Sequence, residues 1–217
     1  MYQTGTVFKK ILFLNVSLYD ILEYLHDDLY HQYENVSGNC MKALKTAGII
    51  IACTTVVLLA SPTPPSLIAG GIAVAIGELI RLWATGHLTR NQEVTTSGPY
   101  AYVRDPLYLG RLFLITGFCI MAWGYALLLL PVGLAVFFLN YMPRKYRKEM
   151  RRLENLFGET YTHYAAYTRS LVPGLKPYPR ASTRRWSLTL CLKENREPYF
   201  ILIIAAVFSG ILFKYFT

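Results

Sequence analysis

Apolar runs of about the length that crosses a bilayer constrain the fold of this chain more than any other feature. A transmembrane helix needs roughly 17 to 25 mostly apolar residues, and this 217-residue sequence is 53% hydrophobic. Only 16% of its residues are charged, whereas soluble domains carry about 25%. The sequence therefore predicts an all-α membrane protein with about five transmembrane helices, at 44–60, 66–84, 107–123, 125–142 and 199–216.

The first 43 residues predict an amphipathic helix rather than a membrane span. Between about Phe8 and Tyr30, apolar residues recur every three or four positions, which is the spacing of one helix face. We expect no secretory signal peptide here, because Asn15, Ser17 and Asp20 interrupt the apolar run and no cleavage site of small residues follows. The helix is expected to lie on the membrane surface or to pack on the bundle.

The placement of charge predicts the orientation in the membrane. The net charge is +9, and residues 143–198 hold thirteen Lys and Arg against five Glu. Because this basic block follows an apolar run directly, the positive-inside rule favours cytoplasmic anchoring over nucleic-acid binding. We expect the N-terminus, 85–106 and 143–198 on the cytoplasmic side. The uncharged turns at 61–66 and 123–125 are expected on the other side.

The predicted organisation has three parts, an N-terminal segment at 1–43, a membrane core at 44–183, and a linker with the last span at 184–217. Within the core, a basic helical stretch at about 143–169 leaves the membrane, and 170–183, rich in Pro and Gly, is expected to be irregular. The four cysteines are scattered, without a Cys-x-x-Cys pair. Neither a metal site nor a disulfide framework is therefore expected.

The stretch 95–110, between the second and third predicted spans, is dense in polar and aromatic residues. Gly98-Pro99 marks a turn, and Asp105 is kept out of helical conformation by Pro106, which can open the next helix. Non-helical backbone near a bilayer is tolerated where it is buried in protein or lines a cavity. The structural alternative is an interfacial tyrosine belt with Arg104 on lipid phosphate. The residues in question are Tyr100, Tyr102, Arg104, Asp105 and Tyr108.

Two motifs carry a resemblance to a known family. The first is Gly-Pro-Tyr-x-x-x-Arg-x-Pro-x-Tyr-x-Gly at 98–110, and the second runs from Glu149 through Phe157-Gly158 to Tyr161 and Tyr164. In this order they resemble the signatures of the isoprenylcysteine carboxyl methyltransferase family, small integral membrane enzymes that use S-adenosylmethionine. The resemblance covers roughly 75–175. Two positions depart from it: Asp105 stands where the family has His or Asn, and Met150 stands where it has a second Glu.

The resemblance implies methyl transfer from S-adenosylmethionine to a lipophilic acceptor, first of all a carboxylate of the isoprenylcysteine type. It implies that the cytoplasmic helical segment closes over the cofactor loop, with Arg104 and Glu149 in catalytic roles. Because a carboxylate is already ionised at neutral pH, alignment matters more than a strong base. A cation would hold such an acceptor. Arg104, Arg81 and Arg111 are the candidates, with Arg81 and Arg111 expected to bind the substrate. The cofactor-binding residues implied are Tyr100, Val103, Arg104, Asp105, Pro106, Tyr108, Leu109, Glu149, Tyr161 and Tyr164.

Several alternatives remain open at this point. Arg81 lies three residues after Glu78, on the same helix face, and a structural ion pair explains it as well as acceptor binding does. The acceptor can instead be a phospholipid amine, which needs a base such as Glu149 or Asp105. A membrane sterol reductase that uses NADPH is a third reading, although those proteins are usually longer. A non-catalytic protein that binds membrane lipids is the fourth.

Overall fold

The computed structural model describes residues 43–44, 46–195 and 197–217. The amphipathic helix predicted between about Phe8 and Tyr30 lies outside the described residues. Contacts group the chain into two units, Met1–Ala52 and Cys53–Thr217. The second unit holds both motifs, and the predicted boundaries after residues 43 and 183 stay predictions.

Every regular element in the described residues is helical, which confirms the all-α class. Among the described residues, three helices are long and apolar enough to cross a membrane, Pro64–Thr85, Gly124–Phe157 and Glu197–Phe216, and two shorter apolar helices are Thr46–Leu58 and Pro106–Ala122. The count of five spans therefore stays a prediction. The main elements are α3 (Pro64–Thr85), α4 (Pro106–Ala122), α5 (Leu129–Ala135), the π-helix η3 (Val136–Tyr141), α6 (Met142–Phe157), α7 (Glu159–Tyr167) and α8 (Glu197–Phe216).

The start of α3 follows from the Pro-rich turn before it. Pro64 takes the first helical position, where its missing N–H is not needed. Thr63 caps the helix, because the Ser66 backbone N–H donates to Thr63 Oγ1 at 3.4 Å and the Thr63 N–H donates to Ser66 Oγ at 2.9 Å. This reciprocal pair is a capping box, which fixes the helix at this end.

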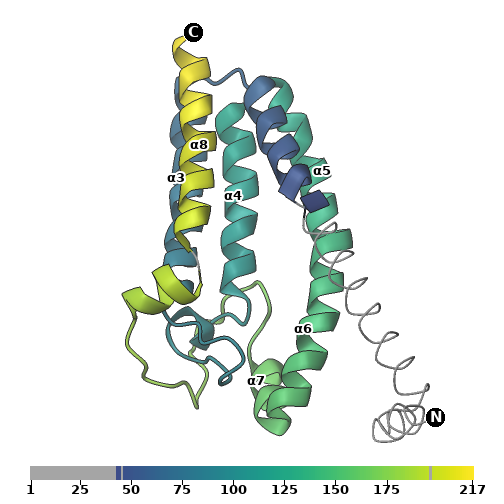
Figure 1. Cartoon of the computed structure of the whole chain (residues 1–217), viewed down its shortest axis with the longest axis vertical. Helices are drawn as coiled ribbons and strands as arrows, with labels where there is room; N and C mark the ends of the chain where they lie inside the picture. The colour runs from purple at the N-terminus through teal and green to yellow at the C-terminus, as the bar shows by residue number, and fades with distance from the viewer. Residues whose placement is uncertain (1–42, 45, 196) are drawn as a thin grey trace, which may run out of the picture. The chain divides into compact units, whose positions relative to one another are not determined.

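Glycines let α3 and α4 approach closely, and Figure 1 shows the two helices side by side with α8 against α3. A Cβ placed on Gly77 would lie 2.8 Å from the carbonyl oxygen of Gly110, and one placed on Gly117 would lie 2.8 Å from the Val74 nitrogen. Small residues at such crossings are typical of helix packing in lipid. The contact holds the first turn of α4, which carries the first motif, against α3.

The turn after α4 closes one end of the unit. Trp123 and Gly124 both have positive φ angles, of 53° and 52°, which reverse the chain at the predicted aromatic turn. Next to this turn, the end of α4 packs on α8 and on the last residues of the Thr46–Leu58 helix. The buried apolar cluster there comprises Ala60, Met121, Ala122, Ala126, Val207 and Ile211.

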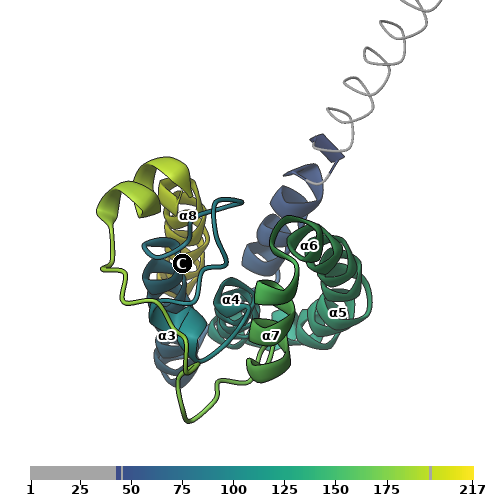
Figure 2. The same cartoon turned by 90° about the horizontal axis from the view of Figure 1, so that it is seen from below.

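At the opposite end, the loop before α4 is fixed by the segment after α7, as the view from below shows (Figure 2). The Arg104 and Asp105 N–H groups donate to the carbonyls of Arg169 and Ser170, at 2.9 and 3.0 Å. The Gly174 N–H donates to the Tyr102 carbonyl at 2.8 Å. The stretch 170–183 contains no helix or strand, as predicted, but its backbone holds the motif loop in place.

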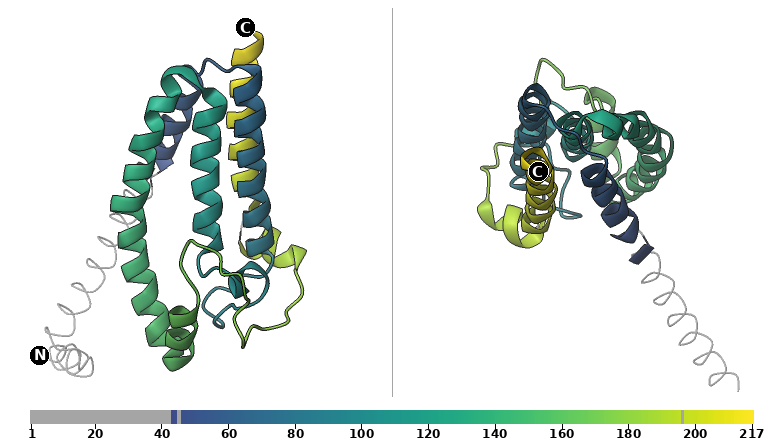
Figure 3. Two further views of the ribbon diagram at one scale, coloured as in Figure 1. Left: turned by 180° about the vertical axis from the view of Figure 1, so that it is seen from behind. Right: turned by 90° about the horizontal axis from the view of Figure 1, so that it is seen from above.

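The outer faces of the long helices are apolar. Ile68 and Leu79 of α3 are 66% and 65% exposed, and Leu202 of α8 is 67% exposed. Apolar side chains exposed on this scale suit contact with lipid. The helices α5, η3 and α6 form one continuous helical run (Figure 3), so the basic stretch predicted after residue 142 continues the preceding apolar helix without a break. It ends at Gly158, whose φ of 52° turns the chain into α7.

Candidate active site

Asp105, the last residue of the motif loop, is held in place by contacts with other residues of the protein. It is the N-cap of α4, directly before the fully buried Pro106. Its Oδ2 accepts a 2.6 Å hydrogen bond from Ser170 Oγ and lies 3.5 Å from Arg104 Nε. Burial raises the pKa of the Asp105 carboxyl, and the hydrogen bond from Ser170 and the charge of Arg104 oppose this shift only in part.

Arg104 joins the loop to both cytoplasmic helices. Its Nη2 donates to the hydroxyl of Tyr146 on α6 at 2.8 Å, and its Nη1 donates to the carbonyl of Ala165 on α7 at 3.0 Å. The guanidinium carbon also lies 5.1 Å from the centre of the Tyr146 ring, within the range of a cation–π contact. Arg104 Nε is buried and makes no hydrogen bond in the described structure. The same side chain therefore positions three segments.

The two motifs meet at Tyr108 and Glu149. The Tyr108 hydroxyl, at the start of α4, donates a 2.9 Å hydrogen bond to Glu149 Oε2 on α6. Tyr108 is 7% exposed, whereas Glu149 is exposed. The helical segment after the fourth apolar run thus contacts the first motif directly.

A small pocket of about 10 Å³, room for about one water molecule, lies between these elements. Four of its lining residues were expected from the sequence: Asp105, Tyr108, Glu149 and Tyr161. Sequence reasoning missed Met142 and Tyr146, and it treated Met150 only as a departure from the family. Helical periodicity could have found them. Met142 and Tyr146 lie seven and three positions before Glu149, and Met150 is next to it, so all three lie on the same side of α6 as Glu149.

The other expected cofactor residues support the loop instead of lining this pocket. The Tyr164 hydroxyl donates a 2.7 Å hydrogen bond to the Tyr100 carbonyl, and both rings are buried. Burial raises the pKa of Tyr161 to about 12, and it raises the pKa values of Tyr100 and Tyr164 as well. All three are therefore neutral phenols at physiological pH. Val103 is buried and Leu109 half-buried, and neither lines the pocket.

Arg81 is enclosed by carboxylates. Its Nη2 lies 2.5 Å from Glu197 Oε1 on α8, and its Nε lies 3.4 Å from Glu78 Oε2. The residue is 1% exposed, and its guanidinium carbon lies 4.3 Å from the centre of the Phe200 ring. One cation between two carboxylates has no net positive charge to offer an anionic acceptor. This arrangement favours the structural ion pair over acceptor binding.

Arg111 occupies a different place, between the pocket and α8. It donates a hydrogen bond to the Tyr141 hydroxyl. Its guanidinium carbon lies 5.6 Å from the ring centre of Tyr108 and 5.9 Å from that of Phe200. No carboxylate lies within ion-pair distance of Arg111 in the described residues. Of the two arginines expected to hold the acceptor, Arg111 has the position and the uncompensated charge.

The residues that the structure describes contain no cluster of three or more His, Cys, Asp or Glu side chains that could hold a metal ion. His87, the histidine nearest the first motif, is 6% exposed and lies 3.1 Å from Ser97 Oγ through its Nδ1. It therefore stabilises the loop that precedes α4.

Two comparisons with known proteins bear on these elements. Residues 65–160, from the start of α3 to the start of α7, match the family described as phospholipid methyltransferase. The chain is also similar to the cobalt-zinc-cadmium resistance protein CzcN of Cupriavidus metallidurans, with 32% identity over 123 residues. That similarity covers 56% of this chain and 55% of CzcN, so the chain spans about half the length of this curated relative. No solved structure matches.

The family match includes the whole first motif and the second motif through Thr160, but not Tyr161 and Tyr164. It supports the broad class of membrane methyltransferase and is compatible with a phospholipid acceptor. The finer resemblance to isoprenylcysteine carboxyl methyltransferases stays a prediction.

Proposed function

We propose that this protein transfers a methyl group from S-adenosylmethionine to a lipophilic acceptor, at the pocket between the start of α4 and the inner face of α6. The observation that carries the proposal is the hydrogen bond between Tyr108 and Glu149, which joins the two motifs at one pocket. The match to the phospholipid methyltransferase family over the same elements supports the same class of reaction.

The pocket residues suit the donor chemically. An aromatic and thioether lining from Tyr108, Tyr161 and Met150 offers an apolar slot, and the carboxylate of Glu149 offers negative charge toward a sulfonium or an ammonium group. Arg104, which precedes the pocket residue Asp105 in the motif loop, is the candidate cation for the donor carboxylate. When bound, S-adenosylmethionine supplies an electrophilic methyl group.

The pocket must widen to admit such a ligand. Its volume of about 10 Å³ is far below the roughly 300–1,000 Å³ of most small-molecule sites. Tyr146 and Met150 come from α6, so a displacement of this helix away from α4 would enlarge the space. We infer that the structure represents the closed arrangement of these two helices.

The chain's own residues would align the acceptor and exclude water. Arg111 lies beside Tyr108 and borders α8 through Phe200, so it is the candidate to hold an anionic group on the acceptor. With a carboxylate acceptor, as in the isoprenylcysteine type, no base is needed. We further propose that these loops face the cytoplasm, because the segments around the pocket are rich in Lys and Arg.

A phospholipid amine is the second candidate acceptor, and the match to the phospholipid methyltransferase family favours it. An amine must lose a proton before or during methyl transfer, and Glu149, a carboxylate that lines the pocket, is the candidate base. In this case the phosphate of the lipid would pair with Arg111. The two acceptors therefore use the same arginine and differ in what they require of Glu149.

Binding of S-adenosylhomocysteine to the purified protein, measured by calorimetry, tests the donor site. Tyr108→Ala and Glu149→Ala are each expected to abolish binding while the protein stays folded. Tyr125→Ala and Glu159→Ala are the matched controls, since Tyr125 is 75% exposed and neither residue lines the pocket. Absence of binding to the folded wild type would reject the methyltransferase proposal and leave the non-catalytic lipid-binding alternative.

The acceptor is identified by incubating the membrane-reconstituted protein with radiolabelled S-adenosylmethionine and extracting the lipids. A methyl ester on a carboxylate is released as methanol by mild base, whereas an N-methyl group is stable. Label that base releases supports the carboxylate, and base-stable label in a phospholipid supports the amine.

A further inference from the structure

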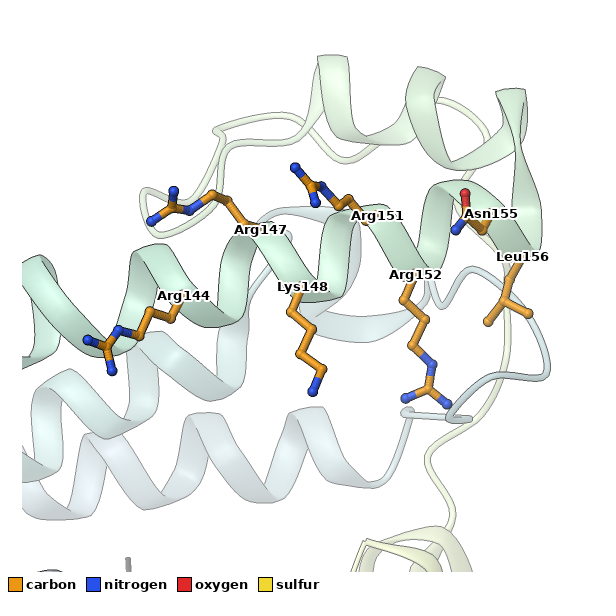
Figure 4. A pocket seen from close by; sticks show the side chains of 7 residues that line it. All are labelled: Arg144, Arg147, Lys148, Arg151, Arg152, Asn155 and Leu156. Atoms are coloured by element: carbon orange, nitrogen blue, oxygen red, sulfur yellow. The ribbon is translucent and has the colours of Figure 1, made fainter. Parts of the chain in front are cut away.

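We propose that anionic phospholipid headgroups bind the outer face of α6 and thereby hold its inner face against the start of α4. The outer face carries five cations, Arg144, Arg147, Lys148, Arg151 and Arg152, and Figure 4 shows them along the helix in two rows. Arg144, Lys148 and Arg152 form one row, and Arg147 and Arg151 form the other.

The first argument is the charge of this face. The groove between the rows is also lined by Asn155 and Leu156, so none of its seven lining residues is acidic. All five cations are exposed, and no carboxylate in the described residues lies within ion-pair distance of them. A single-sign cluster of this kind attracts an anionic surface.

The second argument is depth in the membrane. The hydrogen bond between Tyr108 and Glu149 sets this part of α6 level with the first turn of α4. The 17 residues of α4 make a helix about 25 Å long, close to the roughly 30 Å of the hydrocarbon core. With α4 as a span, as the sequence predicts, its first turn is expected near the edge of the hydrocarbon. Lys148 and Arg151, within two residues of Glu149, are then expected at the depth of lipid phosphates.

The third argument is the direction of the two faces. Met142, Tyr146, Glu149 and Met150 line the pocket, and at about 100° per residue the five cations lie on the opposite side of α6. A bilayer that attracts the outer face acts on the same rigid helix that carries Glu149. A soluble acidic partner is disfavoured because the helix continues directly from an apolar run suited to lipid.

Lipid selectivity of the full-length protein in nanodiscs tests the binding. Spin-labelled phosphatidylglycerol and phosphatidylcholine are compared by the fraction of label that the protein immobilises. The wild type is expected to prefer phosphatidylglycerol, because each cation near an anionic surface contributes on the order of fivefold in affinity at most. The triple variant Lys148→Gln, Arg151→Gln, Arg152→Gln is expected to lose at least about threefold of this preference, since three of the five cations are gone.

The matched control removes the same charge elsewhere on the same side of the protein, with Lys176→Gln, Arg180→Gln and Arg185→Gln, all of which are exposed in the wild type. It is expected to keep the preference. An equal loss in both variants, or no loss in the α6 variant, would overturn the proposal. So would binding of a soluble polyglutamate peptide through the α6 cations without any preference for phosphatidylglycerol.

The effect on the inner face rests on the proposed donor site and is measured separately. The affinity for S-adenosylhomocysteine is expected to be higher in nanodiscs that contain phosphatidylglycerol than in phosphatidylcholine alone, and the α6 variant should not show this difference. Equal affinities beside a clear lipid preference would overturn this coupling. If the ligand binds in neither lipid, the proposed function fails while the lipid measurement still stands.

Discussion

The hydroxyl of Tyr108 and the carboxylate of Glu149 form a 2.9 Å hydrogen bond across 41 residues of chain. Between them lie the rest of α4, the turn at Trp123 and Gly124, and the helical run through α5 and η3. The bond therefore reports on the docking of α6 against α4. Since both residues line the pocket, it also connects the stability of this docking to ligand binding.

We expect a double-mutant cycle with Tyr108→Phe and Glu149→Ala to give a coupling free energy of about 0.5–1.5 kcal/mol, which is typical of one such hydrogen bond. The measurement is the free energy of unfolding in detergent. A control cycle that replaces Glu149→Ala by Glu154→Ala should give no coupling beyond about 0.3–0.5 kcal/mol. Equal coupling in both cycles would show that α6 does not dock through Glu149.

Asp105→Asn is expected to keep the fold and the affinity for S-adenosylhomocysteine. The amide can still accept the hydrogen bond from Ser170, and the carboxylate already faces groups of the protein itself. Loss of all binding in a folded variant would instead show that the ligand uses the carboxylate.

The same substitution should change the dependence of stability on pH. Burial raises the pKa of Asp105 above its ordinary value of 3.8, so the folded state binds a proton more tightly than the unfolded state. The wild type therefore loses stability as pH rises from about 3.8 through the raised pKa. The melting temperature of Asp105→Asn minus that of the wild type should therefore be larger at pH 7 than at pH 4. If this difference in melting temperature is the same at both pH values, the pKa of Asp105 is not raised by folding.

Glu197→Gln is expected to destabilise the protein by about 3–5 kcal/mol, because it removes one partner of a buried ion pair and leaves Arg81 undercompensated. Glu93→Gln is the control, since its pair with Arg184 is 2.9 Å long but 42% and 33% exposed. Such an exposed pair contributes about 0–1 kcal/mol. Thermal unfolding in detergent measures both. Similar effects of the two substitutions would reopen acceptor binding as the role of Arg81.

Gly77→Ala should weaken the contact of α3 with α4, because the new Cβ would meet the Gly110 carbonyl oxygen at 2.8 Å. Overpacking of this kind typically costs about 1–3 kcal/mol. Gly71→Ala on the same helix has nothing within 4 Å of the new Cβ, so the better helix propensity of Ala should leave stability equal or slightly higher. If both substitutions change stability equally, α3 and α4 do not approach each other closely at Gly77.

The helices were largely predictable because apolar runs and turn residues are local signals. The predicted runs at 66–84 and 107–123 differ from α3 and α4 by one or two residues at each end. The partner of Arg81 was not predictable, because Glu197 lies 116 residues away and outside both motifs. Ser170 was missed for the same reason: an irregular segment gives no periodicity from which its contact with Asp105 could be inferred. Whether the predicted site residues bind a ligand stays a prediction.

The π-helix Val136–Tyr141 leads into α6 without interruption. Such wider turns contain an extra residue relative to an α-helix. Each residue added to or removed from a continuous helix rotates everything after it by about 100°. A single deletion at 136–141 would thus swing Glu149 away from Tyr108 and bring cations toward the pocket. The orientation of α6 is consequently encoded in a residue count several positions upstream, where no side chain lines the pocket.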